Sequence, residues 1–184
     1  MHALVRFCCS SLVLSLVACA SIPLGTAMQL RDYDQSRLLQ LNPAELQADV
    51  AFSAGFRIEP DSGSLQLDVL TSQGDHWGRR LPLELGDEGS AEIDGGWFAD
   101  PIPVHRYTLR LSPEGAEALE QLKSQVRGSP IQKLNFAVNW RFQQPQPSGQ
   151  PTAWVDLRLH ADEAPLRLID GAVIPLSADI DADG

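Results

Sequence analysis

The sequence predicts a mainly β domain in which seven or eight antiparallel strands and one amphipathic α-helix enclose a single core. Three observations predict it: apolar and polar residues alternate over many short stretches, turn residues separate those stretches, and one segment changes to helical periodicity. Strands that are apolar on one face must cover one another. We therefore expect a β-sandwich, with a two-layer α+β arrangement of one antiparallel sheet and a helix as the alternative.

Alternation of period two marks the expected strands. They are residues 46–52, 65–69, 81–85, 107–111, 134–142, 153–159 and 166–176. The turn-forming run 60–63, PDSG, predicts a hairpin between the first two strands. Pro82 cannot donate to a strand ladder and predicts that its strand lies at an edge. Asp170 and Gly171 predict a two-residue hairpin within the last stretch.

One segment has the features of a helix. Ser112 offers a cap, Pro113 suits the first turn, and Glu114 adds an acidic side chain there. The apolar residues that follow fall on one helical face: Ala116, Leu119, Leu122 and Val126. A shorter helical turn is expected at residues 36–41.

The first eighteen residues indicate export. Residues 7–18 are uncharged and follow Arg6. A stretch of twelve residues is too short to cross a bilayer as a helix, which takes roughly 20, but it suits the apolar region of a secretory signal. We therefore interpret residues 1–18 as a signal peptide.

Residues 16–19, LVAC, resemble the lipobox of bacterial lipoprotein precursors. The resemblance implies cleavage before Cys19, a thioether-linked diacylglycerol on Cys19, and an amino group acylated with a fatty acid such as palmitate. Ala20, in place of an aspartate, favours the periplasmic face of the outer membrane of a Gram-negative bacterium. The alternatives are an ordinary signal peptide cut a few residues later, or a buried cysteine in an unprocessed helix.

The cysteine count agrees with lipidation. All three cysteines, Cys8, Cys9 and Cys19, lie in the first nineteen residues. Cleavage would leave one, so we expect no disulfide in the exported domain. The expected organisation is a lipidated tether over residues 19–33, one β-rich domain over 34–178, and an acidic tail over 179–184.

Composition excludes some partners. The chain carries 14 Lys and Arg against 24 Asp and Glu, a net charge of −10. Such a surface repels nucleic acid, so we expect no nucleic-acid partner. The tail DIDADG repeats the first half of a calcium loop, but that loop also needs a bidentate Glu at its twelfth position. We expect no metal and no cofactor.

Two glycine-bearing segments, 75–80 and 94–100, read as loops that display aromatic residues beside charges. On the expected strand 153–159, the alternation points one further tryptophan, Trp154, away from the core. The candidate partner-binding residues are Trp77, Arg79, Arg80, Trp97, Phe98 and Trp154. The alternative is structural: the aromatic residues of the two loops fold back to cap the core, and the tryptophan of the strand packs under the helix.

No catalytic motif is present, and His76, His105 and His160 are isolated in the sequence. We expect a non-catalytic, membrane-anchored periplasmic domain that binds an envelope protein. Lipoproteins with immunoglobulin-like or transthyretin-like sandwiches often act as such adaptors, which is an analogy of fold alone. The second hypothesis is a carrier or sensor of a small apolar ligand. The third, a hydrolase, requires a Ser or Asp beside a histidine.

Overall fold

The computed structural model describes residues 34–95, 100–145 and 147–174. They form two helices and seven strands, which are α2 (Gln35–Gln40), β1 (Gln47–Ser53), β2 (Ser64–Thr71), β3 (His76–Ile93), β4 (Ile102–Leu111), α3 (Pro113–Val126), β5 (Ile131–Asn139), β6 (Thr152–Arg158) and β7 (Leu166–Val173). The mainly β class and both expected helical segments are confirmed. Cys19, the tether and the acidic tail lie outside the described residues.

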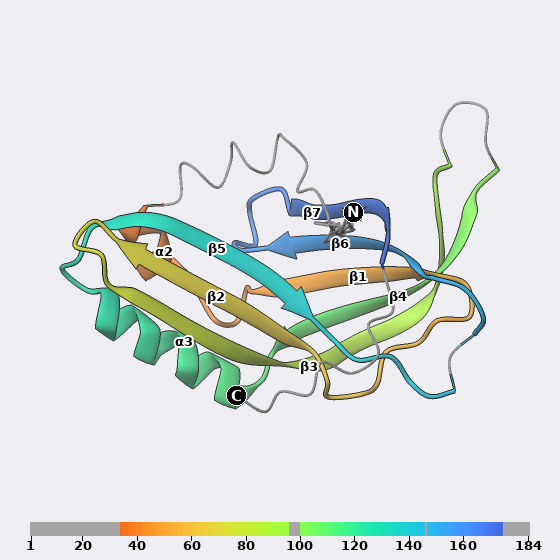
Figure 1. The fold of residues 1–184 in the computed structure, drawn as a ribbon, viewed down its shortest axis with the longest axis horizontal. Helices are drawn as coiled ribbons and strands as arrows, with labels where there is room; N and C mark the ends of the chain where they lie inside the picture. The colour runs from red at the N-terminus through yellow and green to blue at the C-terminus, as the bar shows by residue number, and fades with distance from the viewer. Residues whose placement is uncertain (1–33, 96–99, 146, 175–184) are drawn as a thin grey trace, which may run out of the picture.

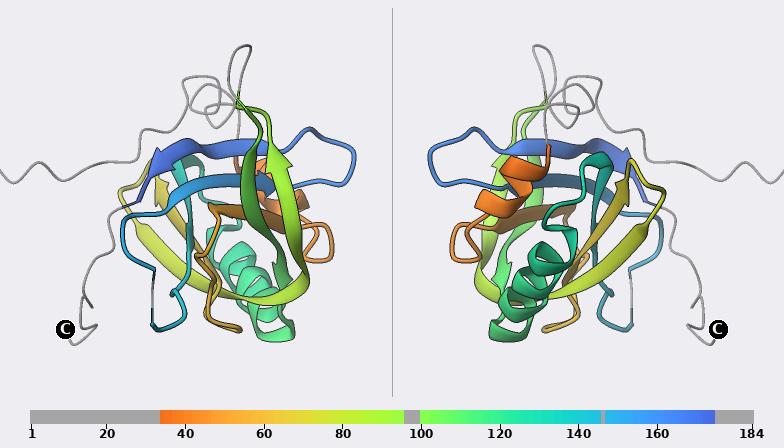
Figure 2. Two further views of the ribbon diagram at one scale, coloured as in Figure 1. Left: turned by 90° about the vertical axis from the view of Figure 1, so that its right-hand side faces the viewer. Right: turned by 90° about the vertical axis from the view of Figure 1, so that its left-hand side faces the viewer.

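All seven strands belong to one antiparallel sheet in the order β5-β2-β3-β4-β1-β6-β7. The predicted sandwich of two separate sheets is therefore not confirmed. The sheet instead curls into a half-barrel (Figures 1 and 2). The 18-residue strand β3 makes this possible. Its residues 76–82 pair with β2 and its residues 83–93 pair with β4, so one strand passes from one half of the sheet to the other.

The two predicted hairpins are wrong, whereas the edge predicted at Pro82 is found in part, because β3 pairs with β4 alone from Leu83 onward. Strand β1 pairs with β4 and β6, and the segment between β1 and β2 forms a bridge with the segment after β5, through Ile58 and Phe142. Pro82 lies where β3 changes partners, and its carbonyl accepts a hydrogen bond from the backbone N–H of Ser112 at 3.1 Å. Gly171 is an extra residue inside β7 with a φ of +66°, which makes a bulge rather than a turn.

The core lies inside the curl, between the two halves of the sheet, and α3 closes it from one side (Figure 2). Side chains from both halves and from the helix meet there. Those at most 1% exposed include Val50, Phe52, Leu65, Leu67, Leu81, Leu119 and Leu122. Each such side chain contributes roughly 1.5–3 kcal/mol on burial.

Helix α3 is fixed at both ends. The hydroxyl of Ser112 accepts from the backbone N–H of Gly115 at 3.1 Å, as a cap should. Gly115 lies so close to β3 that a Cβ atom there would be 2.3 Å from the carbonyl oxygen of Pro82. At the other end, buried Lys123 donates from Nζ to the carbonyl of Leu41, at 2.5 Å, which joins α3 to the end of α2.

Candidate functional site

The β3–β4 hairpin projects from the body of the protein (Figure 1). We call residues 84–93 of β3 with residues 102–106 of β4 the outer hairpin. Within the described residues, the ladder between β2 and β3 ends at Pro82, so β4 is the sole strand that pairs with the outer part of β3. One edge of that part therefore has no neighbouring strand among the residues that the structure describes.

Both faces of this part of β3 are open to solvent. Every residue from Glu84 to Ser90 is exposed, without the buried alternation of β1 or β2. Leu85 is 38% exposed, whereas Leu81, four residues earlier on the same strand, is fully buried. The outer part of β3 thus contributes little to the core.

The outer hairpin also concentrates negative charge. Residues 84–93 carry four acidic side chains and no Lys or Arg, and residues 102–106 add one base, Arg106, in a chain whose net charge is −10. Glu88 lies 4.0 Å from the ring of His105. Within the part of the chain that the structure describes, Asp87 and Glu92 form no ion pair. An excess of carboxylates on one projecting strand attracts basic groups and repels acidic ones.

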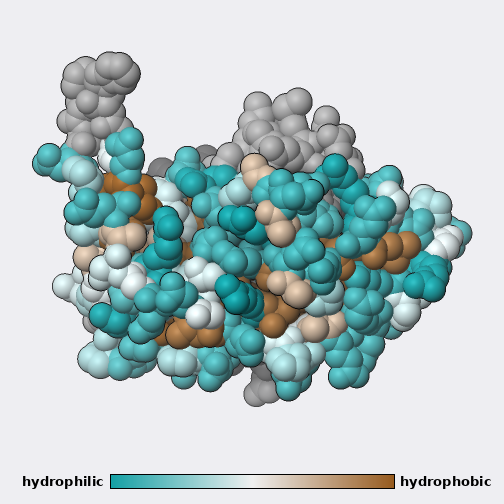
Figure 3. Space-filling view, turned by 180° about the vertical axis from the view of Figure 1, so that it is seen from behind, coloured by the Kyte–Doolittle hydropathy of each residue, from teal (hydrophilic) through white to brown (hydrophobic). Residues whose placement is uncertain are grey.

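A second apolar cluster, separate from the main core, supports the base of the outer hairpin. Its buried members are Ala51, Val104 and Trp154, and Ala91, Ile93 and Ile102 of the hairpin pack against them. In Figure 3, apolar residues gather at this base. Because the cluster lies on the outer face of the sheet, it holds the hairpin without taking part in the enclosed core.

Trp154 is a support residue of this cluster. It points outward as predicted, but it does not pack under α3, whose apolar side chains belong to the main core. The indole is 8% exposed. It lies over Gly171, where an added Cβ would be 3.3 Å from Nε1. The missing side chain in the β7 bulge thus makes room for the tryptophan ring.

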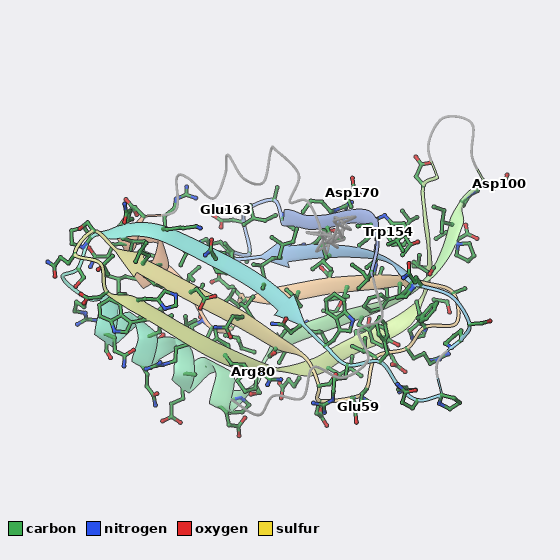
Figure 4. All side chains as sticks on the ribbon, in the orientation of Figure 1. Glu59, Arg80, Asp100, Trp154, Glu163 and Asp170 are labelled. Carbon is green, nitrogen blue, oxygen red and sulfur yellow. The ribbon has the colours of Figure 1, made fainter. Side chains whose placement is uncertain are left out.

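An ion cluster beside Trp154 joins the last two strands. Arg167 of β7 donates to Asp156 of β6 from Nη2 at 3.0 Å and from Nε, and to Asp170 from Nη1 at 2.6 Å. The hydrogen bonds to Asp156 raise the pKa of the Arg167 guanidinium, and those to Asp170 add to the effect. Such exposed pairs contribute at most about 1 kcal/mol. Figure 4 shows Asp170 and Trp154 near one another and Asp100 just before the start of β4.

The predicted partner-binding residues do not form one site. Residues 76–80 belong to β3 rather than to a loop, because they pair with β2. Trp77 is half-buried against the main core, and Arg79 donates to Gln125 of α3 at 2.8 Å. Arg80 is exposed (Figure 4), and β4 and β1 separate this half of the sheet from Trp154. Trp97 and Phe98 lie outside the described residues.

A small cavity of about 210 Å³ lies at one end of the half-barrel. It is lined by Gly55, Phe56, Arg57, Phe142, Gln143, Gln144, Pro145 and Pro147. Beside it, the hydroxyl of Tyr107 accepts from the backbone N–H of Ile58 at 3.3 Å, and burial raises the pKa of that tyrosine. Ligand sites for small molecules usually measure about 300–1,000 Å³. This cavity is smaller than that range.

Each histidine of the domain lies near one carboxylate. The nearest nitrogen–oxygen distances are 3.9 Å to Asp68 for His76, 4.0 Å to Glu88 for His105 and 3.9 Å to Glu45 for His160. Ser90 faces His105 across the hairpin ladder. Among the described residues, however, no hydrogen bond joins a serine hydroxyl to a histidine ring, as general-base activation of a nucleophile requires.

The described residues offer neither a metal-binding cluster nor a membrane-spanning helix. No cluster of three or more His, Cys, Asp or Glu side chains is placed to hold a metal ion. Neither helix is long and apolar enough to cross a membrane.

No protein-family model, curated protein or solved structure matches the chain. The outer hairpin is the feature that the sequence reasoning missed. One sequence signal could have indicated it: residues 84–100 carry six carboxylates and no Lys or Arg, unlike the other predicted strands.

Proposed function

We propose that the protein is a lipid-anchored, non-catalytic domain of the bacterial envelope, and that its outer hairpin binds an envelope protein. One observation carries this proposal. The outer part of β3 keeps a regular ladder with β4 while its residues 84–90 are exposed on both faces and one edge has no strand beside it in the described chain. A strand this exposed does little for the core, and it presents a formed surface to a partner.

The way in which the hairpin is held supports a binding role. An isolated two-stranded hairpin is only marginally stable in water. Here Trp154 and Val104 support its base through the second apolar cluster. A surface that is ordered before binding loses less conformational entropy when the partner arrives. The hairpin is therefore suited to recognition, whereas the small end cavity does not favour a carrier of small ligands.

Cys19 supplies the anchor in this proposal. The short apolar segment before it and the lipobox resemblance support a lipidated residue that holds the domain at the periplasmic face of the outer membrane. One acyl chain gives only marginal membrane binding, while two or more hold a protein firmly. Attachment at one end leaves the folded domain free to reach a neighbouring protein.

Photo-crosslinking in living cells tests partner binding. A photoreactive residue replaces Asp87 or Glu92 on the outer hairpin, and as a control it replaces Arg80 or Lys133, which are exposed elsewhere on the sheet. We expect a specific protein adduct from the hairpin positions and none from the control positions. Equal labelling from all four positions, or none at all, contradicts the proposal.

A second experiment tests the anchor. We expect the mature N-terminal peptide to carry the mass of an acylated Cys19, and Cys19→Ala to release the protein from membranes. Cys9→Ala serves as the matched control, because it lies in the segment removed on processing and should leave membrane retention unchanged. An unmodified N-terminal cysteine, or full retention of Cys19→Ala, contradicts the lipid anchor.

A further inference from the structure

We propose that the partner adds a strand to the free edge of β3, and that this strand alternates basic and apolar residues. The inference rests on the proposed function and names the chemistry of the partner at the same surface. Three features of the outer hairpin carry it: unpaired backbone groups along the edge, acidic side chains on one face, and the apolar side chains of Ala91 and Ile93 at the end of the other face, beyond Asp87 and Arg106.

The backbone of the edge is available for pairing. In a strand, successive N–H and C=O groups point alternately to the two sides, so β4 can pair with only half of those in residues 84–93. Within the described residues, the other half forms no hydrogen bond with any loop or strand. Such an edge is a template for an extended segment of another chain.

The register assigns the side chains to faces. After the bulge between Leu85 and Asp87, residues facing Tyr107, His105 and Pro103 share one face; these are Glu88, Ser90 and Glu92. The other face carries Asp87, Gly89, Ala91 and Ile93. The first face is thus acidic, and the second ends in Ala91 and Ile93, which pack in the second apolar cluster.

A strand laid along this edge would meet both faces. On the acidic face, Lys or Arg side chains would lie opposite Glu88 and Glu92, as favourable cross-strand pairs do. On the other face, apolar side chains would extend the cluster that contains Ala91 and Ile93. Gly89, two residues before Ala91 on this face, leaves room for a partner side chain, because a Cβ atom added there would have no atom within 4 Å. The regular part, residues 87–93, fits a partner segment of about seven residues.

The acidic side chains could instead serve only to keep other strands away from an exposed edge. In that case no strand pairs with β3, and a partner would contact side chains alone. The two explanations differ in one measurable respect. An added strand contacts β3 residue by residue in a fixed register, and a contact through side-chain charge does not.

Crosslink scanning distinguishes them. The photoreactive residue is placed in turn at Glu88, Ser90 and Glu92, which share one face of the regular part, and each adduct is mapped on the partner by mass spectrometry. We expect the contacts to move along one partner segment by about two residues per step, and that segment to carry a net positive charge. Adducts that map to an acidic segment, or that show no order along the chain, overturn the inference while leaving the proposed function in place.

A synthetic peptide of the mapped segment then tests the charges. We expect Glu88→Lys with Glu92→Lys to weaken its binding to the full domain by at least about tenfold, because like charges would then face each other. Glu117→Lys with Asp162→Lys makes the same change of charge at exposed positions elsewhere and should alter the affinity less than twofold. Circular dichroism confirms that both variants fold. Equal weakening in the two variants overturns the inference, and the absence of adducts at every hairpin position overturns the proposed function with it.

Discussion

The two parts of β3 show how one strand can serve two purposes. Residues 76–82 pair with β2, and Leu81 is fully buried in the main core beside α3. Residues 84–93 pair with β4 alone and are mostly exposed. Backbone pairing continues through both parts, so it is the side-chain environment that distinguishes them. A long, fully paired strand therefore need not contribute side chains to the core along its whole length.

The largest difference between the parts should appear on truncating matched leucines. We expect Leu81→Ala to lower the free energy of unfolding by about 2–5 kcal/mol, because it leaves a cavity in the packed core. Leu85→Ala, at a position 38% exposed, should cost less than about 1 kcal/mol. Chemical denaturation measures both values. Equal losses would mean that the outer part of β3 belongs to the core after all.

Matched glycines give the next largest difference. A Cβ at Gly115 would meet the carbonyl of Pro82 at 2.3 Å, so Gly115→Ala must push α3 away from β3. We expect a loss of about 1–3 kcal/mol, as for overpacked sites. Gly89→Ala meets nothing within 4 Å and should be neutral or slightly stabilising. A tolerated alanine at Gly115 would contradict the close packing of helix and strand.

Trp154→Phe sharpens the comparison because it acts on one part alone. The smaller ring should loosen the second apolar cluster, with a cost of about 1 kcal/mol. Amide hydrogen exchange should then become faster in residues 84–93 and 102–104 and stay unchanged in residues 76–82. Faster exchange in both parts of β3 would show that Trp154 supports the whole sheet rather than the base of the hairpin.

The smallest effect concerns acid stability. The carboxylate of Glu45 accepts hydrogen bonds from the N–H of Ala161 and the amide of Asn42, which lower its pKa below the ordinary 4.5. Because the pKa of Glu45 is lower in the folded state, its carboxylate stabilises the fold above pH 4.5. This stabilisation is lost as the pH falls through the folded-state pKa. Glu45→Gln should therefore flatten the fall in unfolding free energy below about pH 4.5. Glu117→Gln, exposed on α3, serves as the control and should follow the unmodified protein.

Local patterns predicted the elements better than their pairing. Alternation located at least part of each described strand, and Ser112 with Pro113 located the start of α3, because these signals depend on neighbouring residues. The outward direction of Trp154 also followed from alternation. The pairing of β1 could not be predicted this way, because it depends on strands about fifty and a hundred residues away. Asp170 and Gly171 predicted a hairpin that does not form. Gly171 instead makes a bulge that accommodates the ring of Trp154.

The outer hairpin was hidden for a different reason. Residues 84–93 are too polar and too rich in glycine to read as a strand, so the sequence suggested an end near Leu85. The ladder continues because β4 pairs with it and the second apolar cluster supports it from Ala51 and Trp154. A strand specified by distant contacts lacks the apolar alternation that marks the other strands. The candidate residues Trp77 and Arg79, which looked like loop residues, belong instead to the buried part of β3.

Amide hydrogen exchange of β3, measured on the purified domain and on the protein in isolated cell envelopes, tests the central claim most directly. Residues 76–82 should be protected in both samples, because their pairing is internal. Residues 84–93 should exchange readily at alternate positions in the purified domain and become protected in envelopes, where the proposed partner strand would pair with them. Equal exchange of residues 84–93 in the two samples would contradict a role of the outer hairpin in partner binding by strand addition.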